Sequence, residues 1–143
     1  MTERFFEPSQ ESGAALFSRN IQGEVVMLNL LRYRDVADYS ASPELAPSEP
    51  ISGREAYQKY IEHTMPFLQE SGGELVFLGE GGNYLISPQN EQWDLVILVR
   101  HKSVSVFMEF VSNQGYRAGM GHRSAALEDS RLLPLVELKD SDL

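Results

Sequence analysis

The sequence has 143 residues, of which 42% are hydrophobic and 23% charged, and its formal net charge is −9. These values are typical of an ordinary globular protein, and we expect residues 1–143 to form a single domain. The acidic balance argues against nucleic acid or an anionic membrane as a partner, because both require a basic surface. The absence of cysteine excludes disulfides, thiolate metal sites and a cysteine nucleophile.

The first part of the chain predicts one helix, one strand and a long loop. The opening MTERFFEPSQE lacks the basic and apolar regions of a signal peptide, and VVMLNLL is too short to span a bilayer, so we expect a cytoplasmic protein. Ser9 can cap a helix at about residues 9–20. Residues 24–33 are apolar on both faces and predict a central strand. Residues 40–50 contain three prolines and predict a surface loop.

A long amphipathic helix is predicted next. Ser52 and Glu55 have the spacing of a capping box, and the helix should continue to about Ser71, with a kink near Pro66 and a stop at Gly72-Gly73. At 100° per residue one stripe is apolar, and it predicts the buried side of the helix. The stripe consists of Ala56, Tyr57, Tyr60, Ile61, Thr64, Phe67 and Leu68.

The second half of the chain alternates strands with short helices, and the core should extend over about residues 22–138. The glycines at 81–82 indicate a tight turn between two strands. The predicted elements are strands at 74–80 and 84–86, a strand at 93–101, a helix at 105–113, a short helix near 123–128 and a last strand at 131–138.

This order predicts an α+β, ferredoxin-like fold: an antiparallel sheet with two helices on one face and an extra N-terminal helix. The strands at 24–33 and 93–101 are apolar on both faces, yet the helices can cover only one. We therefore predict a homodimer in which the uncovered faces of two sheets pack together as an α+β barrel.

Several segments together resemble the domain-of-unknown-function family 1330. These are VVMLNLLRY, the spaced residues of GREAYQKY, the pair GG, WDLVILVRHKS, YRA and HRSAALEDSRLLPL, from about Val25 to Leu135. The resemblance implies the same dimeric α+β barrel fold. Relatives by fold include cofactor-free monooxygenases, haem-degrading enzymes, lactone isomerases and ligand-binding proteins, so the resemblance does not fix an activity.

Aromatic and amide side chains are the first candidates for a ligand site. Asn29 lies within an apolar strand, where its amide needs a partner from the backbone or from a ligand. Trp93, the only tryptophan, packs in the core or forms a flat pocket wall. Tyr57 and Tyr60 belong to the buried stripe of the long helix, and Tyr116 follows the next helix and could point back toward the same pocket.

Cationic residues are the second group of candidates. Arg100 ends a buried strand, where it could bind a carboxylate or simply form an ion pair at the sheet edge. The stretch GYRAGMGHR (115–123) places Arg117, His122 and Arg123 among three glycines, which predicts an anion-binding loop over a pocket. The alternative is a connector in which Arg123 pairs with nearby acidic residues, Glu128 or Asp129.

The three histidines lie on different predicted elements. His63 lies at the border of the long helix's apolar stripe, so it is a candidate catalytic residue or axial haem ligand, or simply a half-buried side chain. The histidines are far apart in sequence and have no metal-binding spacing, so we expect no metal and no cofactor.

The sequence therefore leaves several functions open. The preferred hypothesis is a small-molecule-binding homodimer that acts on an acidic or aromatic metabolite by cofactor-free monooxygenase or isomerase chemistry. Its catalytic candidates are His122 and His63, and its ligand-binding candidates are Asn29, Tyr57, Tyr60, Trp93, Arg100, Tyr116 and Arg123. The alternatives are a non-catalytic ligand-binding dimer and a purely structural dimer.

Overall fold

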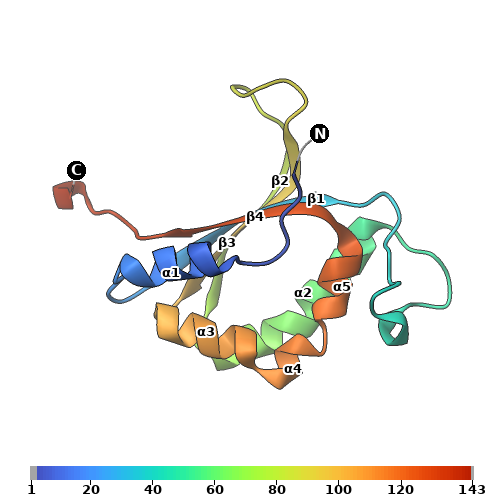
Figure 1. Cartoon of the computed structure of the whole chain (residues 1–143), viewed down its shortest axis with the longest axis horizontal. Helices are drawn as coiled ribbons and strands as arrows, with labels where there is room; N and C mark the ends of the chain where they lie inside the picture. Colours follow the sequence, from blue (N-terminus) through green and yellow to red (C-terminus); the bar gives the residue numbers. More distant parts are fainter. Residues whose placement is uncertain (1–2, 143) are drawn as a thin grey trace.

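The structure is a computed structural model that describes residues 3–142. Its four strands form one antiparallel sheet in the order β2-β3-β1-β4. The helices lie on one side of this sheet (Figure 1). The elements in chain order are α1 (Gln10–Ser18), β1 (Val25–Tyr33), a 3₁₀ turn (Pro43–Leu45), α2 (Gly53–Glu70), β2 (Glu74–Asn83), β3 (Gln92–His101), α3 (Val104–Ser112), α4 (Gln114–Arg117), α5 (Met120–Ala126), β4 (Leu127–Leu135) and a 3₁₀ turn (Asp140–Asp142).

The observed topology confirms the predicted α+β, ferredoxin-like fold. The central strands β1 and β3 pair with Leu28 opposite Leu98, and β4 completes the other side of β1 with Leu133 opposite Leu28. The capping box of α2 is present, since Ser52 accepts a hydrogen bond from the Glu55 backbone and Glu55 accepts one from the Ser52 backbone. No helix among residues 3–142 is long and apolar enough to cross a membrane.

The hydrophobic core lies between the sheet and α2, α4 and α5. Leu31, Leu95 and Ile97 point from the central strands toward Ala56 and Tyr57 of α2, and all five side chains are buried. Because side chains alternate along a strand, their neighbours point to the opposite side, which we call the open face. The open face is apolar in its middle and consists there of Val26, Leu28, Leu30, Phe77, Val96, Leu98, Leu133 and Leu135.

Two of the predicted boundaries in the second half of the chain are wrong. The glycines at 81–82 make no turn, because β2 continues through them to Asn83. A Cβ on Gly81 would lie 2.3 Å from the Trp93 carbonyl oxygen, so the glycine permits a close approach of the two strands. No strand forms at 84–86, where the chain instead bends into the loop that joins β2 to β3.

The last strand begins at Leu127, four residues earlier than predicted. Its polar start is stabilised by the N-terminal segment, which lies beside it. The Phe5 backbone N–H donates to Asp129 at 2.9 Å, and the Ser130 hydroxyl donates to the Phe5 carbonyl. This pairing joins residues more than 120 positions apart, so no local pattern in the sequence could predict it.

Candidate functional site

Three tyrosines gather on the helix-covered side of the sheet. Tyr57 and Tyr60 come from successive turns of α2, and their ring centroids lie 5.2 Å apart. Tyr116 comes from α4, and its hydroxyl lies 2.8 Å from that of Tyr60. The sequence predicted that these tyrosines would share one region, and the structure brings them together as a cluster of phenols.

The environment of this cluster keeps the phenols of Tyr57 and Tyr60 protonated. Burial raises the pKa of Tyr57 and of Tyr60, because a phenolate is poorly solvated there. The neighbouring Tyr116 raises both values further, whereas the Arg123 guanidinium opposes the effect. Tyr57 and Tyr60 are therefore neutral hydrogen-bond donors across the physiological pH range, and Arg123 is close enough to influence them.

Arg123 is the cation of this region, and it has no acidic counterpart there. It lies partly buried on α5 and donates a long hydrogen bond, 3.4 Å, to the Phe6 carbonyl. Within residues 3–142, no carboxylate oxygen lies within 4.0 Å of its guanidinium nitrogens. The two acidic residues that the sequence offered as partners are engaged elsewhere: Glu128 pairs with Arg4, and Asp129 pairs with Arg131.

His122 precedes Arg123 and points toward the loop that follows β1. Its Nδ1 lies 2.7 Å from the Tyr39 hydroxyl, in an edge-on arrangement of the two rings. Burial lowers the pKa of His122, and the nearby charges of Lys59 and His63 lower it further. His122 is therefore neutral at neutral pH and retains a nitrogen that can accept a proton.

His63 and the GYRAGMGHR stretch are joined by close packing. The Nε2 of His63 lies 2.7 Å from the Gly115 carbonyl and donates to it. A Cβ on Gly119 would lie 2.1 Å from the His63 ring, and one on Gly115 would lie 2.3 Å from Phe67. Neither glycine has a positive φ. The predicted loop is thus wrong: the segment forms α4 and α5, and its glycines allow these helices to approach α2.

Asn29 lies on the helix-covered face of β1, on the same side as Leu31. Its Nδ2 donates to the Met27 carbonyl at 3.3 Å, so part of its hydrogen-bonding need is met within its own strand. This contact corresponds to the backbone alternative that the sequence left open.

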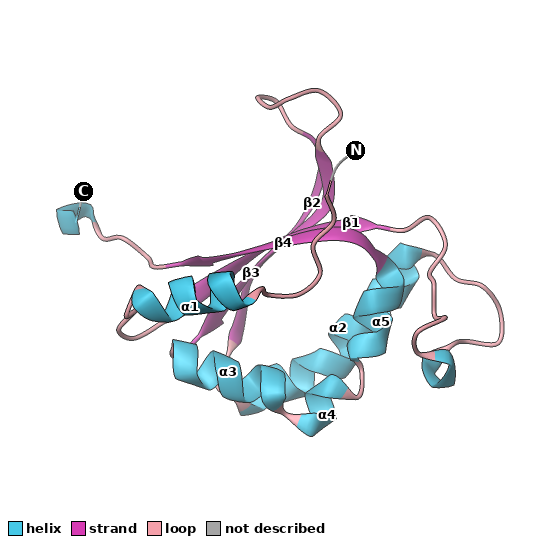
Figure 2. Ribbon diagram, in the orientation of Figure 1, coloured by secondary structure: helices cyan, strands magenta, loops and turns pink. Residues whose placement is uncertain are grey.

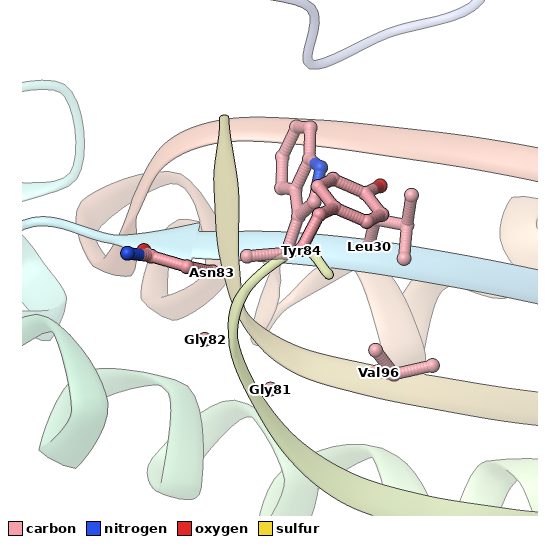
Figure 3. A pocket seen from close by; sticks show the side chains of 7 residues that line it. Leu30, Gly81, Gly82, Asn83, Tyr84 and Val96 are labelled. Carbon is pink, nitrogen blue, oxygen red and sulfur yellow. The ribbon is translucent and has the colours of Figure 1, made fainter. Parts of the chain in front are cut away.

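Trp93 lies on the open face and lines a shallow hollow of about 260 Å³ with Leu30, Val96, Tyr84, Asn83 and the glycines at 81–82 (Figure 3). The guanidinium carbons of Arg32 and Arg131 lie 4.8 and 5.1 Å from the indole centroid. The indole nitrogen is buried, and within the described residues it has no hydrogen-bond partner. The structure therefore separates Trp93 from the tyrosine cluster.

Arg100 lies at the far end of the sheet from Trp93. It pairs with Glu74 and lies 4.0 and 3.9 Å from the carboxylates of Glu24 and Glu137. Of the two roles expected for Arg100, the structure shows the ion pair at the sheet edge, and acidic groups surround the guanidinium.

Two residues of these clusters, Tyr39 and Arg131, were not among the candidates from the sequence. Tyr39 bonds to His122, and it also borders a second hollow, of about 370 Å³, beneath the proline-rich loop. Arg131 stacks on Trp93 and binds Asp129 at 2.7 Å. Burial alone would raise the pKa of Asp129, but hydrogen bonds from Phe5, Arg131 and Ser130 outweigh it and hold the pKa below its usual value.

The region around Arg123 has the chemistry of an anion site. An arginine without a carboxylate partner can bind a carboxylate through two parallel hydrogen bonds. Neutral phenols can donate further hydrogen bonds, and their rings can contact a planar ligand. A neutral histidine next to the arginine could accept a proton. Among residues 3–142, no three His, Asp or Glu side chains are arranged to hold a metal ion.

No protein-family model matches the chain, and no curated protein matches it. Solved structures do. One structure of the RPA0582 protein, in methylated form, is 35% identical, has a TM-score of 0.83 and covers 96% of this chain and 97% of its own. A second structure, described as a protein of unknown function from Rhodopseudomonas palustris, is 36% identical with a TM-score of 0.78, and covers 93% of this chain and 96% of its own.

A more distant match shows the fold alone. A dimeric ferredoxin-like protein of unknown function from Jannaschia sp. CCS1 is 10% identical with a TM-score of 0.53, and covers 80% of this chain and all of its own. By contrast, the two RPA0582 structures share 35% and 36% identity with this chain over at least 93% of both chains. The chain therefore belongs to the same family as the RPA0582 protein of Rhodopseudomonas palustris.

Proposed function

We propose that this protein binds a small acidic molecule, aromatic or aliphatic, between the sheet and the helices. Arg123 would hold the carboxylate. The observation that carries the proposal is that this guanidinium, partly buried in a chain of net charge −9, has no carboxylate within 4.0 Å among residues 3–142. A partly buried arginine without a carboxylate partner keeps its guanidinium free to bind an anion through two parallel hydrogen bonds.

The tyrosine cluster would form the rest of the site. The hydroxyls of Tyr57 and Tyr60 are neutral donors, and the rings of Tyr57, Tyr60 and Tyr116 provide flat apolar surface for an aromatic substituent. Asn29 would contribute the oxygen of its amide from the sheet side. Trp93 and Arg100 lie on the open face and are not part of this proposed site.

We further propose His122 as the group that would carry out proton transfer if the bound acid is a substrate. Its lowered pKa keeps it neutral and able to accept a proton at neutral pH. His63 is a weaker candidate, because its Nε2 already donates to the Gly115 carbonyl. The reaction would be of the cofactor-free monooxygenase or isomerase type. The alternative is a binding protein without chemistry.

The proposed assembly is a homodimer formed through the open face, as expected for the domain-of-unknown-function family 1330, to which we also propose this chain belongs. The chain exposes 9651 Å² of surface, whereas a compact monomer of 16.1 kDa exposes about 7,400 Å². A stable interface removes about 800 Å² from each partner. Phe77 and Leu133 of the open face are each 53% exposed and offer apolar surface for such an interface.

A thermal-shift screen tests the proposed site. Wild type, Arg123→Gln and Arg117→Gln would be heated with benzoate, phenylacetate, salicylate, succinate and glutarate. Arg117 is exposed on α4 and serves as the matched control. An acid at 100 times its Kd adds about 2.7 kcal/mol of stability, which raises Tm by several degrees. We expect at least one acid to stabilise wild type and Arg117→Gln but not Arg123→Gln. An equal response of all three proteins would reject Arg123 as the anion contact.

A further inference from the structure

The loop that joins β2 to β3, residues 84–91, stands out from the sheet as an arm. It projects from the open face, on the side away from the helices (Figures 1 and 2). Its tip has a defined turn, in which the Ser87 hydroxyl donates to the Pro88 carbonyl at 2.8 Å and Asn90 adopts a left-handed conformation with φ 72°. The arm is therefore a shaped extension of the hairpin formed by β2 and β3.

Two adjacent apolar side chains on the arm are almost completely exposed. Leu85 is 98% exposed and Ile86 is 88% exposed, whereas no other large hydrophobic side chain among residues 3–142 exceeds 62%. Scattered apolar residues on a surface are ordinary, but an adjacent leucine and isoleucine on a projecting hairpin form surface that an isolated chain would leave in water.

We propose that this arm is a clasp that packs Leu85 and Ile86 against a second copy of the same chain. The inference rests on the proposed dimer and adds the residues that hold it together. A copy that docks on the open face lies on the side to which the arm projects. In a two-fold dimer both arms act, so four apolar side chains become buried at once.

The exposed surface area of the chain supports a second copy as the partner of the arm and the open face. The excess of about 2,200 Å² over a compact monomer is larger than the roughly 800 Å² that a standard interface removes from each partner. The open face and the arm together therefore provide enough surface for a stable dimer. An anionic lipid surface is a poor occupant, because the chain has a net charge of −9.

The hollow beside Trp93 connects the arm to the open face. Tyr84, the first residue of the arm, lines the hollow together with Leu30 and Val96 of the sheet. The apolar surface thus continues from the middle of the sheet to the base of the arm. A second copy would cover both as one interface, rather than two separate patches.

Sedimentation velocity over a dilution series tests the clasp. The test variant is Leu85→Ser/Ile86→Ser, which removes apolar surface without adding charge, and the matched control is Gln89→Ser on the same arm. Because Leu85 and Ile86 contact little of their own chain, circular dichroism and the unfolding midpoint of the monomer should not change. We expect a dimer for wild type and Gln89→Ser, and a dimer Kd raised at least 100-fold for the double variant.

Two results would overturn the clasp. One is a wild type that is monomeric at all concentrations, which would also remove the proposed dimer. The other is a double variant that dimerises as tightly as wild type. A third contradicting result can come from flotation with vesicles of neutral or anionic lipid. If wild type binds the vesicles and Leu85→Ser/Ile86→Ser does not, the arm contacts a membrane instead of a second copy. The thermal-shift screen of Arg123→Gln tests the ligand site separately, so a failure of the clasp does not affect the proposal for that site.

Discussion

The hydroxyl oxygens of Tyr60 and Tyr116 lie 2.8 Å apart, although the two residues are 56 positions apart in the sequence. The contact joins α2 to α4 within the cluster that contains Phe110 and Leu68. Each hydroxyl is removed from bulk water, so each depends on the other for a hydrogen bond. The pair therefore fixes the position of α4 over the middle of α2.

Removing both hydroxyls should cost less than the sum of the costs of removing each one alone. Tyr60→Phe or Tyr116→Phe leaves the remaining hydroxyl unsatisfied, which should lower the free energy of unfolding by about 1–3 kcal/mol. The double variant should lose less than the sum of the single losses, because no orphaned hydroxyl remains. Urea denaturation of the four proteins measures this coupling. Strictly additive losses would show that the two hydroxyls do not depend on one another.

Gly119 should not tolerate alanine, although its backbone conformation is ordinary. A Cβ at this position would meet the His63 ring at 2.1 Å, so Gly119→Ala should destabilise the protein by about 1–3 kcal/mol through overpacking. Gly13 on α1 has open space around it and is the matched control. There, alanine should stabilise the helix by about 0.5–1 kcal/mol.

A second substitution distinguishes overpacking from other causes. His63→Ala removes the ring that the new methyl group would strike, so the added cost of Gly119→Ala should shrink when His63 is already alanine. Thermal unfolding of the single and double variants provides the comparison. If Gly119→Ala costs the same in both backgrounds, the close approach of α5 to His63 is not the reason that glycine is required.

The sequence predicted the elements that depend on local patterns. The capping box at Ser52 and Glu55 and the apolar stripe of α2 are both local, and both are observed. The two central strands were recognisable because they are apolar on both faces. The prediction was wrong where a glycine acts through a distant partner: Gly81 accommodates the Trp93 backbone, and Gly119 accommodates His63.

The candidate site was harder to predict, because its properties depend on which charges meet in space. Arg123 has two acidic residues within six positions, yet those two pair with Arg4 and Arg131. Nothing local in the sequence distinguishes a paired arginine from an unpaired one. The open-face position of Trp93 likewise depends on its contacts with Arg32 and Arg131, which come from strands distant in the sequence.

Acid should destabilise the protein through His101. This residue is 2% exposed against Phe107 and Phe110, and burial lowers its pKa from 6.5 to about 4. Between these two pH values the unfolded chain binds the proton and the folded chain does not, so stability falls as pH decreases from about 6.5 to about 4. The full effect should be roughly 3 kcal/mol, because one pKa unit corresponds to about 1.4 kcal/mol.

Guanidinium denaturation at several pH values checks this effect. His101→Phe, which keeps an aromatic ring against α3 and removes the titrating group, should flatten the dependence of stability on pH in this range. His122→Phe is the control at a histidine whose pKa is also lowered. If the pH dependence of stability persists in His101→Phe and disappears in His122→Phe, His122 rather than His101 is responsible, and the prediction is wrong.

The most direct measurement of the central claim is a crystal structure grown with the acid that gives the largest thermal shift. We expect its carboxylate within hydrogen-bonding distance of the Arg123 guanidinium, with the remainder of the molecule against Tyr57, Tyr60 and Tyr116. An acid found only in the hollow beside Trp93, or found nowhere while Arg123 binds an acidic side chain, would contradict the proposed site.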